Sequence, residues 1–204
     1  GIRLIKLSNY YHIYFGYTNP DLINYEELLA TYSKNDNILI ALSPASGDIF
    51  DASFLRIVED LSTRAWQIPY ASRVDSITNY QHSVAEDDAL VVDYFLPDSV
   101  VLDKPFIASM RNIALNEPSL VGSLVSKDGS TTGINITLQF PGVDQIKEVP
   151  ESVVQVRNLV TEFEDKYPEV EFYLTGQAML SMAFPEVSRM DMKEMFPVML
   201  LVIF

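Results

Sequence analysis

Apolar residues in the first part of the chain follow a helical spacing and then form a short unbroken run. Residues 38–42 are all apolar, which is typical of a central strand buried on both faces. A helix is predicted before this strand, because apolar side chains recur at intervals of three and four residues after the turn at 19–21. The strand is expected to end in a loop at 44–48.

A second helix is predicted after this loop. Asp51 or Ser53 can cap its first turn, and Pro69 closes it. Its expected apolar face consists of Phe54, Leu55, Val58, Leu61 and Trp66. With a further strand at 73–77, this part of the chain predicts one β-α-β unit.

The second half of the chain predicts a similar unit. Strands are expected at 120–126 and 132–140, joined by the turn at 127–130, whose Asp-Gly pair is a hairpin signal. Pro150 opens a predicted helix that ends at Pro168 and directs inward Val153, Val156, Leu159, Val160 and Phe163. A strand at 170–174 follows, and Gly176 separates it from a final helix. Between the two units we expect an exposed loop with one short strand at 78–99 and a helix at 103–116.

These elements predict an α+β fold. Two β-α-β units that share a sheet give a ferredoxin-like arrangement, with the helices packed on one face of a mixed sheet. We expect residues 1–176 to form this domain. Residues 177–204 are expected to form a helix that changes from polar to apolar along its length.

The apolar end of that helix is the most distinctive segment of the sequence. Residues 196–204 are nine consecutive apolar residues, whereas a membrane-spanning helix needs roughly 20. We expect this segment to be the first turns of a transmembrane helix; a buried terminal helix or strand of a soluble protein is the alternative. No secretory signal segment precedes the domain, so we expect either a cytosolic protein or a piece taken from between two membrane segments.

Charge and composition exclude several classes of function. The 14 basic and 28 acidic residues give a net charge of -14, which disfavours nucleic acid as a partner. The acidity serves solubility, or alternatively attracts a cation or a cationic substrate. The chain contains no cysteine, so it has neither a disulfide nor a thiolate metal site.

The sequence contains no motif of an enzyme, and we expect neither catalysis nor a cofactor. Phosphate-binding loops, nucleophile elbows and zinc-binding helices are all missing, and there are only two histidines, His12 and His82. His82 could be a ligand, although a solvated or structurally bonded histidine is the simpler interpretation. The acidic run Glu86, Asp87 and Asp88 lacks the spacing of a calcium loop.

Five polar residues are candidates for a structural junction rather than for chemistry. Arg73, Asp75 and Asn79 lie in a segment whose side chains can bond one another and cap main-chain groups. Lys34 and Asp36 precede the first central strand, where they can organise a corner of the domain by pairing with charges elsewhere.

Several segments, taken in order, resemble a known family. The chain is similar to the first extracytoplasmic loop of exporters of the resistance-nodulation-division (RND) superfamily, in the branch of the MmpL lipid transporters and Patched-like proteins. The segments that carry the resemblance are Asn19-Pro20-Asp21-Leu22, Lys34-Asn35-Asp36-Asn37, Arg73-Val74-Asp75-Ser76-Ile77-Thr78-Asn79-Tyr80, Gly133-Ile134-Asn135-Ile136-Thr137 and Leu174-Thr175-Gly176.

The resemblance implies a function that these residues alone do not show. It implies a periplasmic porter domain, between the first two transmembrane helices of a bacterial inner-membrane exporter driven by protons. The implied partners are a hydrophobic or amphiphilic transported molecule, the membrane helices and second periplasmic loop of the same protein, and further copies in a homo-oligomer. The proton-relay residues would lie in the membrane helices, outside this sequence.

Two other functions remain open from the sequence. A soluble ferredoxin-like module for ligand binding or regulation would bury residues 196–204 against its own core. An accessory subunit of a secretion system could be built on a similar loop.

Overall fold

The computed structural model describes residues 18–21, 23, 24, 27, 36–86, 89–96, 100–142, 145–183, 186 and 187. For residues 82–86, 89–93, 145 and 146 it describes the backbone alone. The elements in chain order are β1 (Asp36–Pro44), α3 (Ala52–Ala65), β2 (Ala71–Asp75), β3 (Gln81–Glu86), β4 (Ala89–Tyr94), α4 (Lys104–Asn116), β5 (Thr132–Leu138), α5 (Gln145–Lys166) and β6 (Val170–Thr175).

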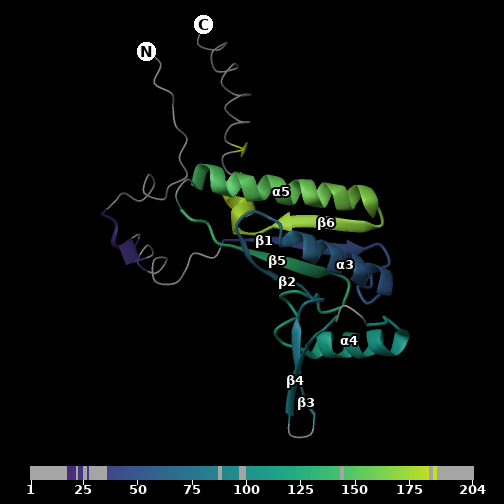
Figure 1. The fold of residues 1–204 in the computed structure, drawn as a ribbon. Helices are drawn as coiled ribbons and strands as arrows, with labels where there is room; N and C mark the ends of the chain where they lie inside the picture. The colour runs from purple at the N-terminus through teal and green to yellow at the C-terminus, as the bar shows by residue number, and fades with distance from the viewer. Residues whose placement is uncertain are drawn as a thin grey trace, which may run out of the picture.

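Four of these strands form one sheet in the order β2-β5-β1-β6 (Figure 1). Each of the units β1-α3-β2 and β5-α5-β6 places its two strands on either side of a strand from the other unit. This interleaving is the split β-α-β arrangement of ferredoxin-like folds. The expected α+β, ferredoxin-like fold is therefore confirmed.

The expectation of a mixed sheet is wrong, because every pairing in this sheet is antiparallel. Strand β1 pairs antiparallel with β5 and with β6, and β2 pairs antiparallel with β5. The two strands of one β-α-β unit do run parallel, but the interleaved strand of the other unit keeps them from pairing. Sequence periodicity indicates the units but not which strands become neighbours.

One face of the sheet carries the hydrophobic core. Buried and partly exposed residues alternate along β1, as expected for a sheet covered on one face. The fully buried side chains of β1 and β5 join those of α3 and α5 in one cluster, which includes Ile40, Ile136, Leu61 and Val156. Both helices therefore pack on the same face, as predicted (Figure 1).

Between β2 and β5 the chain forms an additional layer below the sheet (Figure 1). Residues 78–99 were expected to contain one strand, but β3 and β4 pair as an antiparallel hairpin from Gln81↔Tyr94 to Glu86↔Ala89. The polar sequence of β3 gives no apolar period, so its strand forms through main-chain pairing with β4. The predicted helix at 103–116 is confirmed as α4, with Asp103 as its N-cap.

The strand predicted at 120–126 is wrong. The amides of Ser123, Leu124 and Val125 all donate to the carbonyl of Leu120, so this segment closes on itself in turns. Gly122 makes the reversal possible with a φ of 82°. The predicted turn at 127–130 is present, with Gly129 at a φ of 70°.

Two boundaries also differ from the sequence-based expectation. Helix α3 ends at Ala65, and Ala65 is the last residue of its buried face. Trp66, which was expected on that face, is the C-cap of the helix and is 50% exposed. Helix α5 starts at Gln145 rather than at Pro150. The early turn is fastened by Glu148, which accepts a hydrogen bond from the Gly142 amide at 3.1 Å. The helix continues through Pro150, which has no main-chain N–H to donate.

The helices at the two ends of the domain are described in part. Residues 20, 21, 23, 24 and 27 are helical, and the Asn19 side chain accepts from the Asp21 amide at 2.9 Å. Residues 177–183, 186 and 187 are helical as well. Within the described residues, none of the helices combines the length and the apolar character needed to cross a membrane. The apolar run at 196–204 lies outside the described residues.

Candidate functional site

The structure describes four of the five residues singled out from the sequence. Lys34 lies outside the described residues. Asp36 begins β1 and is buried, on the same core-facing side of the strand as Ile38. Arg73 and Asp75 lie on β2 and flank the buried Val74, so both belong to the opposite face of the sheet. On that face Arg73 Nε donates to Asp75 Oδ2 at 2.9 Å.

Asn79 fastens the turn that follows β2. Its side-chain oxygen accepts from the Ser76 amide at 2.7 Å, and its side-chain nitrogen donates to the Val74 carbonyl at 2.7 Å. The hydroxyls of Ser76 and Thr78 lie 2.8 Å apart in the buried centre of the turn. The polar side chains of the turn therefore form hydrogen bonds within the turn itself, and they fix the direction in which the chain leaves the sheet.

The open face of the sheet contains a hollow, which we take as the candidate site. It has a volume of about 410 Å³ and is lined by Asn37, Ser72, Arg73, Asn135 and Thr137. These residues come from the neighbouring strands β1, β2 and β5. The strand register brings them together, because Thr137 pairs with Asn37 on one side and with Arg73 on the other.

A β-bulge explains why Ser72 and Arg73 both line the hollow. Consecutive residues of a regular strand point to opposite faces, but the pairing of β2 with β5 shifts between Ala71 and Arg73. Ser72 is the additional residue, and its hydroxyl donates to the Thr137 carbonyl at 3.1 Å. The bulge thus adds a second polar side chain to the rim.

Hydrogen bonds hold the floor of the hollow. Asn37 Nδ2 donates to Asn135 Oδ1 at 2.9 Å, and Asn37 Oδ1 accepts from the Gln177 amide at 3.2 Å. Asn135 Nδ2 makes a long contact of 3.5 Å with Thr137 Oγ1. The floor therefore connects the two central strands with the first residue after Gly176.

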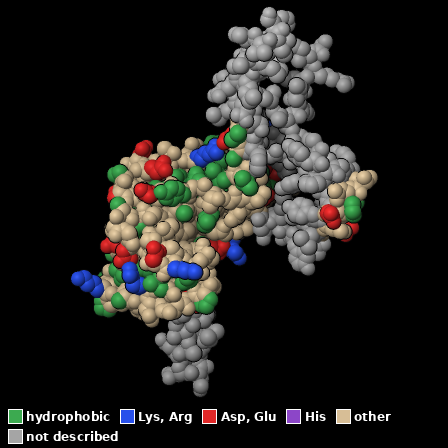
Figure 2. Space-filling view, turned by 180° about the vertical axis from the view of Figure 1, so that it is seen from behind, with side chains coloured by type: hydrophobic (Ala, Val, Ile, Leu, Met, Phe, Trp, Pro, Cys, Tyr) green, Lys and Arg blue, Asp and Glu red, His purple; other side chains and the backbone are tan. Residues whose placement is uncertain are grey.

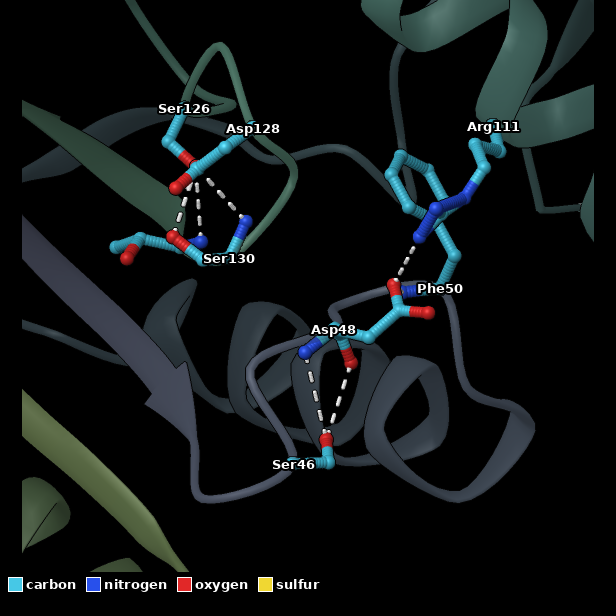
Figure 3. Close-up of polar contacts among 8 residues, drawn as sticks. Ser46, Asp48, Phe50, Arg111, Ser126, Asp128 and Ser130 are labelled. Atoms are coloured by element: carbon cyan, nitrogen blue, oxygen red, sulfur yellow. Dashed lines mark hydrogen bonds and ion pairs between the residues drawn. The ribbon is translucent and has the colours of Figure 1, made fainter.

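A second polar cluster lies beyond the other end of β1 (Figure 3). Arg111 of α4 donates to Asp48 at 2.6 Å, and its guanidinium lies 4.9 Å from the centre of the Phe50 ring. Nearby, Asp128 accepts from the hydroxyls of Ser126 and Ser130. These hydrogen bonds lower the pKa of Asp128 to about 2. The contacts of Arg111 attach α4 to the loop after β1, and those of Asp128 hold the 127–130 turn in shape.

Sequence reasoning singled out Arg73 as a candidate for a structural junction, and it did not predict the hollow or the roles of Ser72, Asn37, Asn135 and Thr137. A signal was present in β5, where Asn135 and Thr137 alternate with the buried Ile134, Ile136 and Leu138. That alternation indicates a solvent-facing sheet surface. The bulge at Ser72 has no signal of this kind, because pairing across strands creates it.

No metal-binding cluster marks another site among the described residues. No group of three or more His, Cys, Asp or Glu residues is placed to hold a metal ion among the residues described. The side chain of His82 and the tip of the hairpin, with Asp87 and Asp88, lie outside that description. Figure 2 shows acidic and basic side chains interspersed with apolar ones on the face turned to the viewer.

Comparison with models of known protein families gives no match, and comparison with curated proteins gives none either.

Proposed function

We propose that this chain is a periplasmic porter-type domain of a proton-driven RND-like exporter in the bacterial inner membrane. In this proposal the domain contacts a hydrophobic or amphiphilic molecule and passes it on, without making or breaking a covalent bond. The membrane helices of the same protein, its second periplasmic loop and further copies of it would complete the transporter.

The observation that carries the proposal is the path of the chain through the sheet. The chain enters the sheet at Asp36 and leaves it after Thr175, and these positions lie at the same end of two antiparallel neighbours, β1 and β6. The main-chain N–H of Gln177 donates a hydrogen bond to Asn37 Oδ1 at 3.2 Å. This bond holds the incoming and outgoing segments of the chain together. Neighbouring entry and exit points suit a domain inserted between two consecutive membrane helices.

Two further features support the proposal. The sheet is built from two β-α-β units, and the family resemblance implies porter subdomains of β-α-β type. The sequence after the domain then changes from a charged segment to nine consecutive apolar residues at 196–204.

The test is the location of the full-length protein and the side of the membrane on which this domain lies. The domain has no cysteine of its own, so Val154→Cys introduces a single thiol into it, at a position of α5 that is 46% exposed. Other cysteines of the full-length protein would be replaced. We expect the protein to sediment with membranes, and a membrane-impermeant maleimide to label it in intact cells with a permeabilised outer membrane.

A matched control uses a position that the fold hides. Ala65→Cys places a thiol where the native side chain is 0% exposed, so it is expected to react only after denaturation. Recovery of the Val154→Cys protein in the soluble fraction, with labelling only after cell lysis, would refute the proposal.

A soluble ligand-binding or regulatory module is the second candidate. The hollow on the open sheet face favours it, because polar groups that converge on one place can orient a small ligand. The same fractionation separates the two candidates. An accessory subunit of a secretion system would sediment with membranes only when its partner proteins are present.

A further inference from the structure

The hollow on the open face presents an excess of hydrogen-bond donors. The orientation of its amides follows from the Gln177 main-chain N–H, which can only donate, so the group that it contacts on Asn37 is the side-chain oxygen. Asn37 Nδ2 then faces Asn135, whose oxygen must accept from it. One main-chain hydrogen bond therefore fixes the orientation of both side chains.

In this arrangement each amide oxygen accepts one hydrogen bond, and several N–H and O–H groups remain to donate. Asn37 Oδ1 and Asn135 Oδ1 are both engaged. Each amide group retains one N–H, and the Thr137 hydroxyl, which accepts at 3.5 Å, retains its proton. Within the described part of the chain, no side chain or carbonyl accepts from these groups.

Arg73 adds a positive charge to the same rim. It bonds to Asp75 through Nε at 2.9 Å, and its two terminal nitrogens make no hydrogen bond to any described residue. The outer edge of a guanidinium binds an oxyanion with two parallel N–H groups. The Arg73 side chain is 68% exposed, so this edge is accessible to a ligand.

We propose that the hollow binds the oxyanion of a small or amphiphilic molecule, a carboxylate or a phosphate group. Arg73 would hold the anion, and the donors of Asn37, Asn135 and Thr137 would orient it. The protein has a net charge of -14 and so gives anions no general attraction. Anion binding in the hollow would therefore depend on the hydrogen-bond donors that line it. The inference is independent of the exporter proposal, because it concerns the hollow whether or not the protein is membrane-bound.

The test measures equilibrium binding of radiolabelled octanoate to the full-length protein by dialysis. Unlabelled acetate, inorganic phosphate and octyltrimethylammonium serve as competitors. We expect saturable octanoate binding that Arg73→Gln weakens about tenfold, the loss of one charge-assisted interaction. Arg73→Lys keeps the charge and should retain part of the affinity. Displacement by acetate or phosphate shows that the free anion suffices, whereas displacement by unlabelled octanoate alone identifies an amphiphilic anion.

Two further variants separate anion recognition from a change in folding. Asp75→Asn removes the carboxylate beside Arg73 and should strengthen octanoate binding, opposite in sign to Arg73→Gln. The control Arg56→Gln removes an exposed arginine that is likewise paired with a carboxylate, Glu59 at 2.7 Å, but lies on α3 away from the hollow. It should leave binding unchanged.

Three results would overturn the proposal. One is the absence of saturable binding of any of the anions. Another is an equal effect of Arg73→Gln and Arg56→Gln. The third is equally strong displacement by octyltrimethylammonium, which would show that the protein recognises the apolar chain and not the anion.

Discussion

Gly176 lies so close to Asn37 that no other residue fits at its position. A Cβ added to Gly176 would lie 2.5 Å from the Asn37 main-chain oxygen and 3.0 Å from the Cα of Ile38. Gly176 also has a φ of 116°, a conformation that L-residues rarely adopt. The chain turns here from β6 into the final helix, in contact with the first residues of β1.

Gly176→Ala should therefore be strongly destabilising. The contact with backbone atoms adds to the cost of the positive φ, for a total of about 2–4 kcal/mol in the free energy of unfolding. Urea denaturation followed by circular dichroism measures the change. Gly142→Ala is the matched control, since Gly142 has a φ of 75° but nothing within 4 Å of an added Cβ. It should cost about 1–2 kcal/mol, and an equal loss in both variants would contradict the role of the close contact.

The Asp51 carboxylate caps α3 and is expected to contribute measurably to stability. It accepts from the amides of Ser53 at 2.9 Å and Phe54 at 3.2 Å, and from the Ser53 hydroxyl. Asp51→Ala should lower the free energy of unfolding by about 1 kcal/mol. Asp51→Asn retains a capping oxygen, so thermal denaturation should show a smaller loss. Equal losses would mean that the charge, and not the cap, is responsible.

The Asp128 carboxylate should titrate far below an ordinary aspartate. Hydrogen bonds from Ser126 and then Ser130 lower its pKa to about 2, from an ordinary value of 3.8. Because the pKa is lower in the folded state, the stabilisation is fully present above pH 3.8 and is lost as the pH falls towards 2. Carbon-detected NMR titration of the side-chain carboxyl measures this pKa. Ser126→Ala should raise it, whereas Ser46→Ala, in the neighbouring loop, should leave it unchanged.

The ion pair between Arg157 and Glu186 should attach the final helix to α5 in a pH-dependent way. Its two hydrogen bonds measure 2.7 Å and 3.0 Å, and the hydrogen bond from Arg157 lowers the pKa of Glu186 below its ordinary 4.5. The contribution is therefore complete above pH 4.5 and is lost as the pH falls through the lowered value. The side chains are 39% and 37% exposed, so solvent limits the effect to about 0–1 kcal/mol.

Hydrogen exchange of the amides at 177–183 measures that attachment. Exchange should accelerate in Glu186→Gln at neutral pH, and acidification should affect the variant less than the wild type after correction for intrinsic exchange rates. Glu162→Gln is the control, because it breaks a similar pair with Arg64 that joins α5 to α3 instead. Acceleration at 177–183 in both variants would show a general loosening of α5.

The sequence alone determined the two β-α-β units and their buried faces, except at Trp66. The apolar spacing of Val153, Val156, Leu159, Val160 and Phe163 predicted the inward face of α5, and all five are buried. The run at 38–42 predicted the central strand. These predictions succeed because burial requires an apolar residue at every turn or at every second position, and that period is visible in one dimension.

Tertiary structure alone decided which strands pair and where the hollow lies. Strand β3 has no apolar period and forms because β4 supplies hydrogen-bond partners to its main chain, so the hairpin could not be read from the sequence. The hollow depends on the register that places Thr137 between Asn37 and Arg73, and on the bulge that adds Ser72. Contacts across strands join residues that lie far apart in the sequence, such as Leu39 and Thr175, and no local pattern encodes them.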